Sequence, residues 1–180
     1  MYAANIIAYI AKWNEEYIPD IIEADAIPSF IQIFKCDRQV SWNLMTEKDA
    51  AVYGLVQICR KENYRDLCIQ QGIIKPLISF INSIANIKFL PDSYSNNVSA
   101  LIVCLCRPYN AQTSSENAQL LLPELNKLSQ NLNNGVILNA IILIREFLEG
   151  GPKYTELLID FELMQFFWIS FPLKWNIFNI

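Results

Sequence analysis

The sequence predicts an all-α protein built from repeated helical units, and three observations support this fold class. Several segments carry apolar residues at positions i, i+3, i+4 and i+7, which places them on one face of an α-helix. Similar helical segments recur at regular intervals along the chain. No segment alternates apolar and polar residues for long enough to indicate a β-strand.

Three long helices are expected from these apolar stripes. In the segment 46–59 the stripe follows the full helical pattern, and Thr46 with a following acidic residue is a helix-start signal. The segment 95–106 repeats the pattern and ends before Pro108, which disfavours continuation of a helix. The segment 135–148 carries the third long stripe.

Shorter helices are expected between the long ones. The segment 64–72 ends at Gly72, a typical residue at the carboxyl end of a helix. The segment 73–84 has Pro76 in its first turn, where a missing N–H group costs nothing. A further helix is expected over residues 116–132.

The long helices align with one another by their apolar pattern. This alignment gives spacings of 48, 47 and 42 residues between corresponding positions. The segments 23–34 and 70–81 also share an apolar pair, a proline and then an apolar pattern. Units of this length cannot bury their apolar faces alone and stack into a solenoid. An unrelated helical bundle is the alternative.

Composition restricts the possible functions. Hydrophobic residues make up 53% of the 180 residues and charged residues 18%, so the chain is too apolar to be disordered. The absence of a glycine-rich loop argues against a phosphate-binding fold. The net charge of −4, with no run of Lys and Arg, argues against nucleic acid as a partner and permits a basic one.

The cysteines and the lack of histidine argue against metal and catalytic sites. Four of the five cysteines lie in apolar periodic stretches, which predicts buried thiols in a reducing compartment. A zinc site at Cys104 and Cys106 would need two more ligands in a chain without histidine. We therefore expect no enzyme activity, no cofactor and no metal. The cysteines are Cys36, Cys59, Cys68, Cys104 and Cys106.

Three stretches resemble the armadillo repeats of importin-α, the adaptor that carries basic nuclear-localisation peptides. They are NYRDLCIQQGIIKPLISFIN (63–82), NVSALIVCLCRPYN (97–110) and LLPELNKL (121–128). The resemblance extends over about residues 3–160, and we expect an armadillo-repeat domain over 1–160. It implies a right-handed superhelix of about three to four repeats. It also implies a non-catalytic peptide adaptor of the cytoplasm and nucleus.

The resemblance further implies a concave groove lined by the long helices, where the family has a Trp and, four residues later, an Asn. The Trp stacks on peptide lysines and the Asn holds the peptide backbone. Only Tyr53 and Gln57 keep comparable chemistry in this sequence. A one-residue shift in the last repeat would bring Leu143 and Phe147 into these positions. The Trp positions hold Asn5, Tyr53, Ala100 and Ile142, and the Asn positions hold Tyr9, Gln57, Cys104 and Glu146.

Lys61 stands eight residues after Tyr53, where the family's lysine pocket has an aspartate. Spacings of four and eight predict Tyr53, Gln57 and Lys61 on one groove-facing helical strip. A cation at this position would repel a cargo lysine, and Glu146 and Glu149 would offset part of this repulsion. We therefore expect weakened binding of nuclear-localisation peptides. A non-catalytic scaffold that binds a different protein is the alternative function.

The two ends of the chain depart from the family. The family's basic amino-terminal arm, which docks importin-β, has no counterpart here, so we do not expect importin-β as a partner. Residues 161–180 match no repeat and form a diverged hydrophobic tail. Because Pro172, Lys174 and Asn176 interrupt its apolar run, we expect an interface or an unpaired core face and no membrane span.

Overall fold

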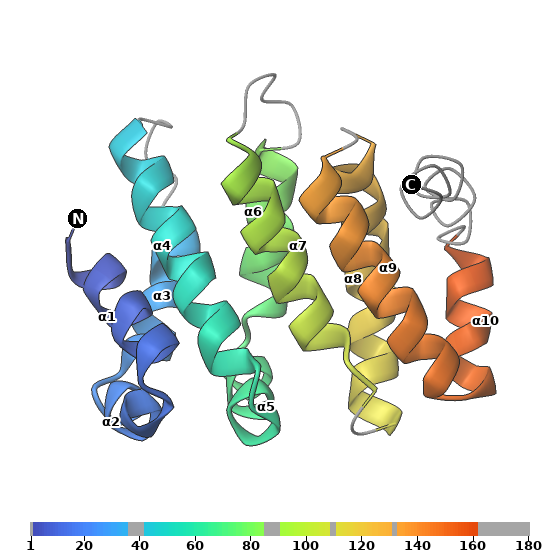
Figure 1. The fold of residues 1–180 in the computed structure, drawn as a ribbon, viewed down its shortest axis with the longest axis horizontal. Helices are drawn as coiled ribbons and strands as arrows, with labels where there is room; N and C mark the ends of the chain where they lie inside the picture. Colours follow the sequence, from blue (N-terminus) through green and yellow to red (C-terminus); the bar gives the residue numbers. More distant parts are fainter. Residues whose placement is uncertain (1, 36–41, 85–90, 109–110, 131–132, 162–180) are drawn as a thin grey trace, which may run out of the picture. The chain divides into compact units, whose positions relative to one another are not determined.

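A computed structural model describes residues 2–35, 42–84, 91–108, 111–130 and 133–161 of the chain (Figure 1). These residues form α-helices and one 3-10 helix, and no β-strand occurs among them. The prediction of an all-α protein is confirmed. The chain divides into two compact units, residues 1–90 and residues 91–180.

The first unit consists of helices α1 to α6 and the 3-10 helix η1. Its centre is α4, which packs against α1, α3 and α5, while α6 packs on α3. The elements are α1 (Tyr2–Trp13), η1 (Glu15–Tyr17), α2 (Ile18–Glu23), α3 (Ala26–Lys35), α4 (Trp42–Cys59), α5 (Glu62–Gln70) and α6 (Ile74–Ile84).

Aromatic side chains and one glycine fix the packing in this unit. The rings of Phe34 on α3 and Phe80 on α6 stack with centroids 5.4 Å apart. A Cβ atom on Gly54 of α4 would lie 2.8 Å from the Phe30 ring and 3.5 Å from Cβ of Ala8. Gly54 therefore lets α3 and α1 approach α4 closely.

The turn from α5 to α6 has the geometry that the sequence predicts. Gly72 has φ +80°, a conformation that glycine adopts without steric cost. Its N–H donates to Ile69 O at 2.9 Å and the Ile73 N–H donates to Cys68 O at 3.3 Å, which together form a Schellman motif. The predicted end of this helix at Gly72 is confirmed.

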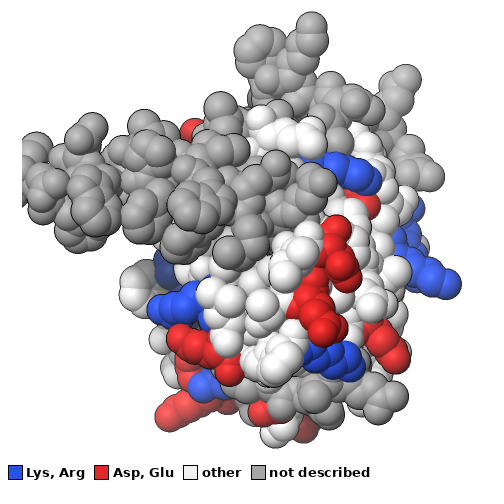
Figure 2. All heavy atoms as spheres, turned by 90° about the vertical axis from the view of Figure 1, so that its right-hand side faces the viewer, with Lys and Arg blue, Asp and Glu red and all other residues white. Residues whose placement is uncertain are grey.

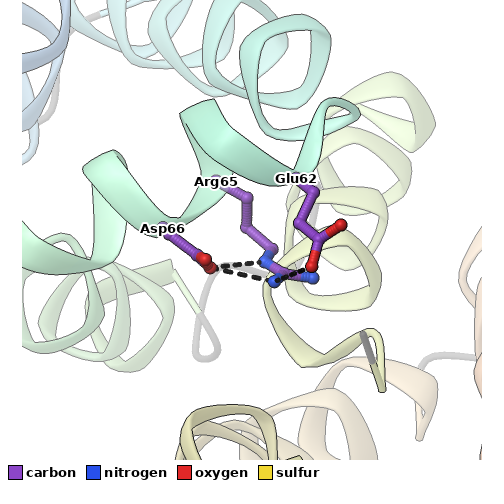
Figure 3. A network of polar contacts seen from close by, with 3 residues as sticks. All are labelled: Glu62, Arg65 and Asp66. Carbon is purple, nitrogen blue, oxygen red and sulfur yellow. Dashed lines mark hydrogen bonds and ion pairs between the residues drawn. The ribbon is translucent and has the colours of Figure 1, made fainter. Parts of the chain in front are cut away.

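Arg65 on α5 is buried as deeply as an apolar core residue. Its side chain is 2% exposed and its Nη2 lies 2.9 Å from Oδ1 of Asp66 and 4.0 Å from Oε1 of Glu62 (Figure 3). The Arg65 Nε also donates to Oδ1 of Asp66, at 3.1 Å. The carboxylates of Asp66 and Glu62, on the same helix, therefore compensate the charge of the buried Arg65 guanidinium.

The described residues of the second unit form four helices. α7 packs against α8 and α9, and α10 packs against α9 and α8. The helices are α7 (Asp92–Cys106), α8 (Ala111–Ser129), α9 (Asn134–Glu149) and α10 (Pro152–Asp160).

Hydrogen bonds attach the start of α9 to α7. Asn133 caps α9 by accepting from the N–H groups of Gly135 and Val136, and its Nδ2 donates to Oδ1 of Asp92 at 2.7 Å. Nearly two turns further along α9, Asn139 Nδ2 donates to Oδ1 of Asn96 at 3.0 Å. The beginnings of both helices are therefore held in one relative position within this unit.

Two helices start four or more residues earlier than the sequence-based expectation. α4 begins at Trp42, so Thr46 lies inside the helix and is not its start. The residues before it, which include Leu44 and Met45, favour helix enough to override the capping signal at Thr46. α8 begins at Ala111 and not near 116, and it continues through Pro123.

α1 presents apolar side chains on opposite faces. Ala8 and Ala11 are buried on the face toward α4. About half a turn away, Ile6, Ile10 and Trp13 are 56%, 40% and 76% exposed. This second, exposed row of apolar side chains is unusual for a helix at the surface, which normally has one apolar face.

Other sequence-based expectations concern the cysteines, the membrane and the tail. Cys59, Cys68, Cys104 and Cys106 are buried as predicted, and Cys36 lies outside the described residues.

Among the described residues, no single helix is long and apolar enough to cross a membrane. Helices α5 and α6 pass that test only together, with an 81° bend between them. The tail predicted over 161–180 lies, apart from Phe161, outside the described residues.

Candidate functional site

The predicted groove residues of the first unit lie on two helices packed side by side. Asn5 and Tyr9 belong to α1, and Tyr53 and Gln57 belong to α4 (Figure 1). Asn5 and Tyr53 are half-buried and Tyr9 is exposed, whereas Gln57 is only 5% exposed. The aromatic faces are thus accessible, while most of the Gln57 amide is enclosed.

Lys61 lies beyond the end of α4, which corrects the expectation of one helical strip. α4 ends at Cys59, and Lys61 is the extended residue that precedes α5, with φ −94° and ψ 129°. Because α4 ends before Lys61, helical spacing relates Tyr53 to Gln57 but not to Lys61.

The Lys61 side chain forms an ion pair with η1. Its Nζ lies 2.6 Å from Oε2 of Glu15, and the two side chains are 51% and 64% exposed. A cleft of about 500 Å³ opens beside this pair. Carboxylates outnumber ammonium groups around it, so a cation from outside would meet attraction as well as repulsion from Lys61. The cleft is lined by Glu15, Glu16, Lys61, Glu62, Asn63 and Tyr64.

Lys12, which was not among the predicted site residues, contacts the Tyr53 ring. The Nζ of Lys12 on α1 lies 5.8 Å from the centroid of the Tyr53 ring and 4.9 Å from that of Trp13. Both distances lie within the range of about 6 Å for a cation–π interaction. Lys12 follows Asn5 by seven residues, so helical spacing alone was a signal that it shares the face of Asn5.

The predicted site residues of the second unit also lie on two neighbouring helices. Ala100 and Cys104 belong to α7, and Ile142 and Glu146 belong to α9, which packs against α7. Ala100 and Ile142 are half-buried and Cys104 is 5% exposed. None of these three side chains provides an aromatic ring or an amide.

The burial of the α9 side chains distinguishes between the two possible alignments of this helix with the groove positions of importin-α. Leu143 and Phe147 are fully buried and belong to the core. Ile142 and Glu146 are partly exposed on the same helix. A peptide could therefore reach Ile142 and Glu146, and could not reach the alternative pair.

Glu146 is held by a residue that the sequence analysis did not single out. The Nε of Arg107, at the carboxyl end of α7, lies 3.1 Å from Oε1 and 3.2 Å from Oε2 of Glu146. The side chains are 25% and 16% exposed, so the contact is partly shielded from water. Glu149 is 3.8 Å from Arg145 and both are well exposed. The carboxylates expected to attract a cargo lysine thus have partners within the chain.

On the face seen in Figure 2, acidic and basic side chains are mixed among uncharged ones. Within the described ranges no group of three or more Cys, Asp or Glu residues could hold a metal ion.

Comparison with known proteins finds a distant and partial similarity to importin subunit alpha-3 of Caenorhabditis elegans. The two chains are 28% identical over 102 residues, which make up 57% of this chain and 19% of the relative. The chain thus spans about a fifth of the length of that curated relative. No family model matches the chain, and no solved structure matches it. The resemblance stated from the sequence is confirmed at this level.

Proposed function

We propose that the chain is an importin-α-like adaptor fragment for protein import into the nucleus, which binds nuclear-localisation peptides weakly. The observation that carries the proposal is the pair Tyr53 and Gln57 on α4, in a chain similar to importin subunit alpha-3. An accessible ring accepts the stem of a peptide lysine, and an amide bonds to a peptide backbone. An adaptor with this activity works in both the cytoplasm and the nucleus.

The proposal includes an armadillo arrangement of about three to four repeats in a right-handed superhelix. Support comes from each unit taken by itself. The long helices α1 and α4 pack side by side in the first unit, and α7 and α9 do so in the second. When armadillo repeats stack, the last helices of consecutive repeats pack side by side in this way.

Weak affinity follows from the side chains that line the two helix pairs. Ala100, Cys104 and Ile142 offer no ring or amide to a peptide. Each lost aromatic stack or amide contact costs on the order of 1 kcal/mol. Gln57 is largely enclosed, so its contact with a peptide backbone is weaker than that of an exposed amide.

The test is a titration of the protein into a fluorescently labelled lysine-rich signal peptide. The matched control is the same peptide with its lysines replaced by alanine. We expect saturable binding of the lysine peptide, weaker than nanomolar, and no binding of the control. Nanomolar affinity would contradict the loss of groove contacts, and equal signals for both peptides would contradict signal recognition.

A non-catalytic armadillo scaffold for protein–protein interaction is the second candidate. The observation in its favour is that Glu146, a carboxylate expected to attract a cargo lysine, is already engaged by Arg107. A scaffold of this kind would give no lysine-dependent signal in the same titration.

A further inference from the structure

The Tyr53 ring already has a cation close to it, and this cation comes from the protein itself. Lys12 lies on α1 and Tyr53 lies on α4. The 5.8 Å between the Lys12 Nζ and the ring centroid brings the ammonium group to the place where a peptide lysine would stack. The adjacent Trp13 ring, 4.9 Å from the same Nζ, holds the ammonium from α1.

Helix packing explains why Lys12 reaches this ring. Ala8 of α1 faces the position of Gly54 on α4, 3.5 Å from the place of its absent Cβ atom. These two small residues bring the helix backbones together. Lys12 follows Ala8 by one helical turn and Tyr53 immediately precedes Gly54, so both side chains lie beside this close contact.

We propose that Lys12 is an internal ligand of the Tyr53 ring and determines which side chains this part of the groove accepts. This inference rests on the proposed function, because it concerns the same peptide-binding surface. A peptide lysine can stack on Tyr53 only after the Lys12 ammonium leaves the ring. Lys12 is exposed and therefore able to move, but its charge stays nearby and repels a second cation.

The cation that follows α4 is already compensated. Lys61, which precedes α5, lies 2.6 Å from Oε2 of Glu15. The Lys12 ammonium instead lies near the rings of Trp13 and Tyr53. Lys12 is therefore the cation that competes directly for the aromatic face.

The variant that tests this is Lys12→Met, which keeps most of the side-chain stem and removes the charge. We expect it to bind a labelled lysine-rich peptide about two- to fivefold more tightly than wild type, the size of one exposed cation–π contact. Lys12→Arg keeps a cation over the ring and should bind like wild type. Lys75→Met is the matched control, because Lys75 is an exposed lysine on α6 and its loss changes the net charge equally.

A double-variant cycle with Tyr53→Leu separates the ring contact from general repulsion. In the Tyr53→Leu background the gain from Lys12→Met should fall, because no ring remains to be vacated. If the gain is the same in both backgrounds, Lys12 acts as a distant charge only and the inference is overturned. Circular dichroism verifies that each variant keeps its helical content.

A measurement without peptide tests the contact itself. Nuclear Overhauser effects between the Lys12 ε-methylene and the Tyr53 ring protons should be present in the unliganded protein and disappear at saturating peptide. Their absence in the unliganded protein would overturn the inference and leave the proposed function standing. If neither wild type nor Lys12→Met binds the peptide, the proposed function fails, even where the contact is observed.

Discussion

The ammonium group of Lys61 lies 2.6 Å from the Glu15 carboxylate, so this cation has a partner within the protein. Both side chains are more than half exposed. An exposed pair of this kind contributes at most about 1 kcal/mol to stability. The main effect of the pair is electrostatic, because Glu15 lowers the repulsion that Lys61 exerts on a peptide lysine.

Lys61→Asp should strengthen binding of a lysine-rich peptide. The substitution removes a repelling cation and adds a carboxylate next to Glu15, and the gain should shrink as salt rises because both groups are exposed. Fluorescence anisotropy at low and high salt measures the change. Lys61→Met serves as the control and should give a smaller gain; an affinity for Lys61→Asp equal to wild type would contradict a role of this position in peptide binding.

Tyr53→Ala should weaken binding of the same peptide by about two- to fivefold, because the aromatic platform is lost. Tyr53→Phe retains the ring and should bind like wild type. Isothermal titration calorimetry distinguishes the two variants. If Tyr53→Ala and Lys61→Asp both leave the affinity unchanged, the scaffold function is the better description.

Arg107→Met should destabilise the protein by about 1–2 kcal/mol, because it leaves the mostly buried Glu146 carboxylate without this partner. Chemical denaturation followed by circular dichroism measures the difference. Arg145→Met removes a pair whose members are about 70% exposed, and it should change stability by a few tenths of a kcal/mol. Equal effects of the two variants would contradict the assignment of the Arg107 contact.

Gly135→Ala should cost about 0.5–1.5 kcal/mol, because the added Cβ would lie 2.6 Å from Oδ1 of Asn96. The exposed Asn96 side chain then has to move and lose its bond to Asn139. Thermal unfolding of the single variants and of the double variant with Asn96→Ala checks this explanation. The penalty should be much smaller in the Asn96→Ala background, and a purely additive cycle would rule out the clash.

Gly72→Ala should also destabilise the protein, by roughly 1–2 kcal/mol, but for a different reason. No atom lies within 4 Å of the place of its Cβ, so the cost comes from φ +80° and not from crowding. Gly72→Asn should cost less, because asparagine tolerates this conformation better. Thermal unfolding measures both, and an equal loss for Ala and Asn would contradict a conformational origin.

Local signals made several elements predictable from the sequence. Gly72 ends α5 because glycine tolerates a positive φ, and Pro76 fits the first turn of α6 because proline fixes a helical φ. The start of α4 was mispredicted because capping at Thr46 is a weak preference that a longer run of helix-forming residues overrides.

The partners of the candidate site were harder to predict. Lys12 reaches Tyr53, and Arg107 reaches Glu146, across pairs of helices that are brought together by packing. Sequence spacing within one helix indicates which residues share a face, but not which residue of a neighbouring helix that face contacts. The path of the chain after α4 likewise decides that Lys61 is not on the helical face of Tyr53.

The small residues that join α1 to α4 also determine how firmly α1 is held. Its buried side chains, among residues 3–13, are Ala8 and Ala11, and alanine buries little apolar area. Elements anchored in this way open at a lower free energy than the rest of a protein. Because Lys12 belongs to α1, its contact with the Tyr53 ring requires α1 to be packed on α4. A peptide bound between α1 and α4 would therefore suppress local unfolding of α1 and slow the hydrogen exchange of its amides.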